Sequence, residues 1–442
     1  MIVKIKTSLS KINYKLFLAL LILGLAPTIY TTLRVFFLGQ LPGEWSFSIA
    51  GQLSWVNLIY EILKEAIILP LYHFINKAKD DKSKFSNIVR TGMLISLAVY
   101  AILSAVVFVF AEPLLTLMAT DSTIIAESAV YIRIESIAHV FTILADFILV
   151  ALVAINKSKY LYAFTGAKLI LCLVSDTFLV SALPVSANLG VNGIGYSNII
   201  VNALLLVVAF VFLAKEGVRI FTKEKLDFSW AKEFAKIGSI SGVESLVRNL
   251  AYMVMIARMV NVVGEQGTYW VANNFIWGWL LLPVIQLGEL IKEEVSADKE
   301  NVRRNSLGYF SITAIISVLW FASIPAWKPF MTHVLGFTDV DKLFSLVMLL
   351  VGFYVLYAIQ NVFDSTFYGL GKTNYMLFES VVTNSIYYGI AFIMYATNVW
   401  TPTLTGIALL FGIGNAFDSV VSLVAYSFML KKEKINILDV ER

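Results

Sequence analysis

Long apolar stretches recur along almost the whole chain, and short loops that hold most of the charged residues separate them. Stretches such as 91–110, 161–180 and 199–213, with their flanks, are apolar over roughly 20 residues, which is enough to cross about 30 Å of hydrocarbon. The stretch nearest the N-terminus, residues 15–38, is too long for a signal-peptide core and lacks a small-residue cleavage site, so we interpret it as a helix. We predict twelve membrane-spanning helices, over residues 15–38, 46–76, 88–110, 123–153, 159–182, 190–214, 235–261, 267–291, 306–326, 341–367, 373–397 and 402–430.

Lysine and arginine gather in alternate loops of this pattern. One side has only Lys328 and Lys342. The other side has the N-terminal lysines at 4, 6, 11 and 15, the basic loops at 77–84, 157–159, 215–236, 292–304 and 372, and the tail at 431–434. Basic residues prefer cytoplasmic loops. We therefore expect a multi-pass protein of the plasma (inner) membrane with both termini in the cytoplasm.

The chain also aligns with itself at an offset of 224 positions, the separation of Arg34 from Arg258. Six helices are an even number, so both halves start on the same side and form parallel repeats. We expect an all-α membrane protein with two six-helix lobes, 1–214 and 237–442, related by a pseudo-two-fold axis along the membrane normal and joined by a basic cytoplasmic linker, 215–236. Further pairs at this offset are Gly43 with Gly267, Trp55 with Trp279, and Glu65 with Glu289.

Composition excludes several classes of protein. The chain is 59% hydrophobic and 14% charged, with a mean hydropathy of +0.79, which a set of soluble domains would not have. Its net charge of +4 does not indicate nucleic-acid binding, because most of the basic residues are in the loops between membrane helices. The single cysteine, Cys172, allows no disulfide framework. The three histidines are scattered, so we predict no metal centre, no enzymatic activity and no cofactor, although a site for Na⁺ stays open.

Ionisable residues inside the predicted helices are the main candidates for function. Each costs on the order of 2.5–3.5 kcal/mol to insert, so such residues normally face the protein interior and pair. Structural ion pairs are one interpretation, but their number favours a water-filled, charge-lined cavity between the lobes. The candidates for substrate binding or ion coupling are Glu61, Glu65, Asp146, Glu244, Arg248, Asp364, Glu289, Arg34 and Arg258. Pro27, in the middle of the first helix, should kink it and is a candidate for gating.

The repeat predicts where some of these residues lie. Arg34 and Arg258 fall late in helices that start inside, so they belong to the outer half of the membrane. Glu65 and Glu289 fall late in helices that start outside, so we expect no Arg34–Glu65 bridge. Each arginine should instead pair locally or reach the outer interface. Trp55, like its repeat mate, is interpreted as an interfacial anchor.

Several short motifs resemble the multidrug and toxic compound extrusion (MATE) family of the MOP flippase superfamily. They are Pro27 with the run Arg-Val-Phe-Phe-Leu-Gly at 34–39, the segments 189–195 and 238–244, Gly-Glu-Gln-Gly at 264–267, and Gly-Leu-Gly-Lys-Thr at 369–373. The resemblance implies two six-helix lobes, a central cleft and rocker-like alternation driven by protons or sodium ions.

The chain departs from that family at one position. Many relatives carry an acidic residue in the first helix where this chain has Arg34, so the resemblance does not carry over a cation site built on that carboxylate. Glu244 does match the acid on the seventh helix of many relatives, and Asp364 lies on the tenth helix, where some relatives have a coupling acid. Arg34, Arg248 and Arg258 suggest a cavity that tolerates anionic groups.

The leading hypothesis is a secondary active exporter. It would move small amphipathic organic molecules out of the cytoplasm by alternating access, coupled to H⁺ or Na⁺. One alternative is a flippase for a lipid-linked, phosphate-bearing substrate, whose phosphates the arginines would bind. Another alternative is a membrane scaffold without transport. We expect a monomer whose partners are membrane lipid and the small-molecule substrate, with no nucleic acid.

Overall fold

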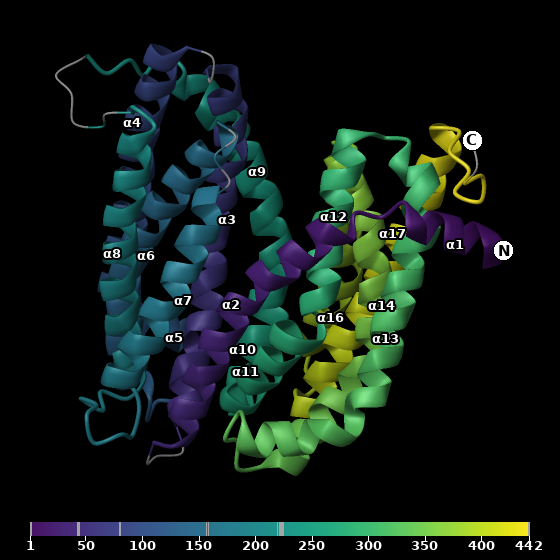
Figure 1. Ribbon diagram of the computed structural model, residues 1–442. Helices are drawn as coiled ribbons and strands as arrows, with labels where there is room; N and C mark the ends of the chain where they lie inside the picture. Colours follow the sequence, from purple (N-terminus) through teal and green to yellow (C-terminus); the bar gives the residue numbers. More distant parts are fainter. Residues whose placement is uncertain are drawn as a thin grey trace. The chain divides into compact units, whose positions relative to one another are not determined.

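The computed structural model describes residues 2–41, 45–78, 81–155, 157, 159–218, 220 and 225–440. The side chains at 69, 72, 73, 76 and 244 also lie outside this description, as does Gly43 of the predicted repeat. The described residues form helices joined by short loops (Figure 1). Twelve helices or broken helices coincide with the twelve predicted spans to within seven residues at either end.

The first half of the chain contributes six of these spans. They are α2 (Tyr14–Gly39), α3 (Ser46–Ala78), α4 (Lys82–Val109), α6 (Ile125–Ala154), α7 (Lys159–Leu179) and α8 (Val191–Lys215). All but α3 are apolar enough to count as candidate spans by length and composition; α3 is 33 residues long but carries Glu61, Lys64 and Glu65 near its middle. Two short helices, α1 (Ile2–Ser10) and α5 (Ala111–Leu117), were not predicted.

The second half contributes the other six, three of them interrupted by a π-helical turn. They are α9 (Ala231–Tyr252) with η1 (Met253–Ala257) and α10 (Arg258–Val262); α11 (Gln266–Phe275) with η2 (Ile276–Leu280) and α12 (Leu282–Ala297); α13 (Asn301–His333); α14 (Val340–Gly369); α15 (Thr373–Val382) with η3 (Thr383–Tyr388) and α16 (Gly389–Ala396); and α17 (Leu404–Lys432). The second of these is bent by 52°. Pro283 has no N–H for the carbonyl four residues earlier, so the helix breaks there.

Packing divides the chain into two compact units. One comprises 33–270, and the other comprises 1–32 together with 271–442. This division does not follow the linker at 215–236, because α9 packs along α3 and the first two thirds of α2 belong to the other unit. The lobes 1–214 and 237–442 therefore stay a prediction from the repeat.

In the unit of 33–270, α6 is the central helix and packs against α3, α4 and α8 (Figure 1). Phe147 and Ile148 on α6 and Trp55 on α3 are almost completely buried. Gly193 lets α8 approach the end of α7, because a Cβ there would lie 2.6 Å from the carbonyl oxygen of Leu179. Trp55 donates a 3.0 Å hydrogen bond to Gln52 and is 1% exposed, so its interpretation as an interfacial anchor is wrong.

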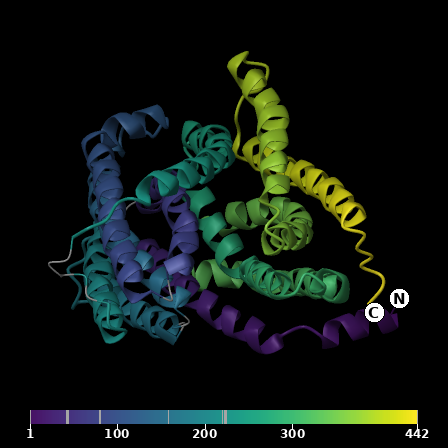
Figure 2. The ribbon, with the colours of Figure 1, turned by 90° about the horizontal axis from the view of Figure 1, so that it is seen from above.

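In the unit of 1–32 and 271–442, α14 lies between α12, α13 and α17. The two chain ends also lie together in this unit, in both views of the ribbon (Figure 2). Lys4 and Lys11 donate hydrogen bonds to the backbone carbonyls of Leu438 and Val440, at 2.8 and 2.9 Å. Helix α1 was not predicted, and its hydrogen bonds to the rest of the chain reach segments more than 290 residues away.

Helix α4 begins six residues before the predicted start at residue 88. Asp81 caps it by accepting hydrogen bonds from the backbone N–H groups of Ser83 and Lys84, both at 3.1 Å. The hydrogen bond from Lys84 lowers the pKa of the Asp81 carboxyl most, and the bond from Ser83 lowers it further. An aspartate before a helix is a known start signal, and it could have corrected the boundary.

Candidate functional site

The unit of 33–270 contains a buried ionic network built from four helices. Arg34 on α2 binds Asp176 on α7 with two nitrogens, at 2.7 and 3.2 Å, and donates to Asn198 Oδ1 on α8 at 2.8 Å. Asn198 in turn donates to Glu135 on α6 at 2.7 Å. The side chain of Asp176 is fully buried and that of Arg34 is 11% exposed. The guanidinium of Arg34 is thus held by Asp176 and Asn198, with Glu135 next to them.

A second group of charges connects α3 with α6 and α9 in the same unit. Lys64 pairs with Asp146 at 2.9 Å, and Glu65 pairs with Arg248 at 2.5 Å. Glu61 lies beside these charges on the same face of α3. All four paired side chains are partly exposed, so this group lines accessible space, unlike the Arg34 network. The i, i+3, i+4 spacing of Glu61, Lys64 and Glu65 places them on one face of α3, but it could not identify their partners.

Three other candidates are less buried or lie outside the described residues. Arg258 donates from Nε to the carbonyl of Leu117 at 3.0 Å. Glu289 pairs with Lys292 on its own helix at 2.7 Å. The repeat mates Arg34 and Arg258 therefore have different partners, as do Glu65 and Glu289. The side chain of Glu244 lies outside the described part of the structure, so its predicted role on α9 stays a prediction, as does the gating role of Pro27 within α2.

The unit of 1–32 and 271–442 contains a cluster of three carboxyl groups. Asp364 comes from α14, Glu379 from α15 and Asp418 from α17. Gln360 Nε2 lies 2.6 Å from Asp418 and 3.3 Å from Asp364, so one amide group bridges the two aspartates. Glu379 lies beside Asp364. The sequence had singled out Asp364 alone as a candidate.

Hydroxyl groups complete this acidic cluster. Thr383 donates to Asp418 at 2.6 Å, and Ser422 donates to Asp364 at 3.1 Å. Ser419 donates to Gln360 Oε1 at 2.9 Å, which fixes the orientation of the amide. The helical π-turn η3 carries Thr383, and this turn rotates the rest of that helix relative to α15.

No basic side chain balances the acidic cluster among the described residues. None of the three carboxyl groups takes part in an ion pair there, and Glu379, which is 3% exposed, has one oxygen without a hydrogen-bond partner. Burying charged carboxylates without a partner is costly, and binding of a proton or a cation relieves that cost. Across the described chain no group of three acidic, histidine or cysteine residues has the arrangement of a metal site. The cluster is therefore suited to binding a proton or a cation and releasing it again.

Comparison with known proteins gives this architecture a family likeness. The MatE family model matches residues 76–178, which cover α4, α6 and nearly all of α7. No curated protein sequence matches the chain. MATE proteins are transporters and not enzymes, which agrees with the expectation from the sequence.

Solved structures of low sequence identity share the fold over almost the full length. An inward-facing multidrug resistance MATE family transporter of the MOP superfamily is 16% identical, with a TM-score of 0.76, and the match covers 92% of this chain and 95% of that one. A mutant of the Vibrio cholerae MATE transporter VcmN is 14% identical, with a TM-score of 0.70 and 98% coverage of both chains. A MOP superfamily transporter from Pyrococcus furiosus, whose binding pocket of reverse polarity suggests a different function, is 15% identical, with a TM-score of 0.70 and coverage of 97% and 98%. The predicted resemblance and the predicted fold class, twelve helices in two lobes, are confirmed.

Proposed function

We propose that this MATE-like chain is a secondary active exporter of small amphipathic organic molecules, coupled to an inward proton gradient. The observation that supports proton coupling is the acidic cluster of Asp364, Glu379 and Asp418. It has one buried carboxyl group, Glu379, and two half-buried ones, Asp364 and Asp418, with a bridging amide and no basic partner among the described residues. The Arg34 network is the opposite case, because a guanidinium already pairs with its buried aspartate, Asp176.

Proton release from the cluster would change the packing of the helices that carry it. With the carboxyl groups protonated, α14, α15 and α17 meet through neutral hydrogen-bonding groups. When two or three of these groups ionise, they repel one another at close range in a medium of low dielectric constant, which favours separation of the helices. A proton gradient would thereby bias one arrangement of these helices over another, which is the requirement for alternating access.

Transport assays in proteoliposomes, with one gradient imposed at a time, test this proposal. We expect a pH gradient without sodium to drive accumulation of a lipophilic cationic dye, and a sodium gradient at equal pH to drive none. Protein-free vesicles provide the baseline. If sodium alone drives accumulation, the proton-coupling proposal is wrong.

The flippase alternative has less support. It requires arginines available for the phosphates of a lipid-linked substrate, but Arg34 is bound to Asp176 and Arg248 to Glu65. A second carboxylate, Glu135, is connected to the Arg34 network through Asn198. These acids reduce the positive potential that a diphosphate would need. We therefore favour an exporter.

Replacing Glu244 with glutamine should reduce gradient-driven transport without lowering expression. Glu244 lies on α9 one turn before Arg248. Arg248 pairs with Glu65, one of the partly exposed charged residues of α3. Dye accumulation in proteoliposomes measures the effect. Glu233→Gln, an exposed position in the first turn of the same helix, is the control and should transport normally. Wild-type transport by the Glu244 variant would remove this residue from the mechanism.

The proposed orientation places the basic loops in the cytoplasm. We expect a cysteine at Lys225 to be inaccessible to a membrane-impermeant maleimide in intact cells and to react after permeabilisation. A cysteine at Asp341, 86% exposed in its side chain, should react from outside. Cys172 is buried and gives little background, and it can be replaced by serine. Labelling at Lys225 from outside would contradict the proposed topology.

A further inference from the structure

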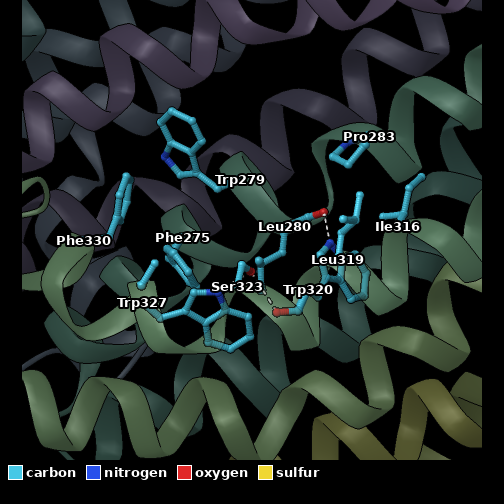
Figure 3. Close-up of a pocket in the computed structure, with 11 residues that line it drawn as sticks. Phe275, Trp279, Leu280, Pro283, Ile316, Leu319, Trp320, Ser323, Trp327 and Phe330 are labelled. Atoms are coloured by element: carbon cyan, nitrogen blue, oxygen red, sulfur yellow. Dashed lines mark hydrogen bonds between the residues drawn. The ribbon is translucent and has the colours of Figure 1, made fainter.

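A cavity of about 400 Å³ lies in the unit of 1–32 and 271–442, between the broken helix α11–η2–α12 and the C-terminal half of α13 (Figure 3). Five of its eleven lining residues are aromatic. Phe275 and Trp279 come from the broken helix, and Trp320, Trp327 and Phe330 come from α13. None of the residues that we have placed in the acidic cluster lines it.

The rings of this aromatic pocket contact one another in tilted and edge-to-face pairs. Phe275 lies 5.5 Å from Trp327 and 5.7 Å from Phe330, measured between ring centroids. Trp279 lies 5.2 Å from Phe330, with the two ring planes at 72°. Edge-to-face pairs are favourable arrangements that hold such rings in place. The pocket therefore has a wall that is set by its own contacts.

The wall offers no indole N–H group to an occupant. Trp279 donates to Thr32 at 3.0 Å, Trp320 to the carbonyl of Leu280 at 2.8 Å, and Trp327 to Ser323 at 2.9 Å. Ser323 itself donates to a backbone carbonyl, at 2.8 Å. No charged residue lines the cavity. An occupant that brought an anionic or hydrogen-bonding group would lose its hydrogen bonds to water without replacement.

The mouth of the pocket opens on an apolar surface of α13. Leu319 lines the cavity and is 60% exposed, and its neighbours Ile315 and Val318 are 54% and 66% exposed. This exposed surface belongs to a helix long and apolar enough to span the membrane. A membrane helix presents such a surface to lipid chains, whereas charged and polar residues face the protein interior or a water-filled cavity.

We infer that the aromatic pocket binds one acyl chain of a membrane lipid, inserted from the leaflet that the C-terminal half of α13 reaches. The pocket has the size of a small-ligand site, for which about 300–1,000 Å³ is usual. Its ring faces pack against methylene groups, and its wall lacks the polar partners that the amphipathic substrate of an exporter would require. The bound chain lies against the helix break at Leu281, where Trp320 holds the carbonyl of Leu280. This inference does not depend on the proposed transport activity.

Photolabelling of the full chain in vesicles tests the inference. The probe is a phosphatidylcholine with a diazirine near the end of one acyl chain, diluted into unlabelled phospholipid. We expect labelled positions to include the inward-facing Trp320 and Trp327, which are 4% and 3% exposed, besides the outward-facing Val318. Labelling of outward-facing positions alone would overturn the inference, and this comparison needs no variant.

A pocket-filling variant provides the second test. Ala326 lines the pocket, so Ala326→Trp should abolish labelling inside it while leaving outward labelling unchanged. Ala314→Trp adds the same indole to an exposed position of α13 outside the pocket and should label like the wild type. Equal labelling inside the pocket of both variants would contradict lipid binding there. Displacement of the label by a water-soluble aromatic cation would show a substrate site instead, which also contradicts the inference.

Discussion

Replacement of Arg34 by leucine is expected to lower the free energy of unfolding by about 3–5 kcal/mol, the usual effect of removing one partner of a buried ion pair. The change leaves Asp176 fully buried without its cation and removes the 2.8 Å bond to Asn198. Reversible denaturation of the purified protein in detergent, followed by tryptophan fluorescence, measures the loss.

Two controls separate charge from packing in this experiment. The double variant Arg34→Leu with Asp176→Leu removes both charges and should recover most of the lost stability, because no buried carboxylate is left unpaired. Lys157→Ala breaks the 3.0 Å loop pair with Glu216, and it should cost about 1 kcal/mol or less because that lysine is 40% exposed. A double variant as unstable as the single one would show that the ion pair is not the cause.

Replacement of Asp364 by asparagine is expected to stop proton-driven transport while the protein still folds and binds substrate. The amide has nearly the shape of the acid and keeps an acceptor for Ser422 and a group beside Gln360, but it cannot take up or release a proton. The measurements are dye accumulation under a pH gradient and proton release on addition of substrate, both in proteoliposomes. We expect both to fall to the level of protein-free vesicles.

A matched control for this variant is Glu293→Gln. Glu293 is exposed on α12 in the same unit, and the same loss of one carboxylate there should leave transport unchanged. Asp418→Asn should resemble the Asp364 variant, because Gln360 joins both aspartates. Undiminished proton-driven transport by both aspartate variants would exclude the acidic cluster as the coupling site.

The sequence by itself determined the long membrane-spanning helices and their number, although not the short helices α1 and α5. Whether a segment spans the membrane depends on its own hydrophobicity and length, so residues 341–367 alone suffice to predict α14 (Val340–Gly369). The same holds for faces within one helix: the spacing of Glu61, Lys64 and Glu65 placed them together. The wrong start predicted for α4 also has a local cause, because Asp81 caps this helix, which begins six residues before the predicted start.

Only the tertiary structure decided which charges meet. Arg34 and Asp176 are 142 residues apart, and nothing in either segment marks the other as its partner. The acidic cluster takes its carboxyl groups from three helices, so it depends on how each helix is rotated about its axis. Helix rotation and interhelical distance result from packing between side chains distant in sequence. For this reason the sequence predicted the polar residues of the membrane region but not their partners, nor the aromatic pocket at the break in α11–η2–α12.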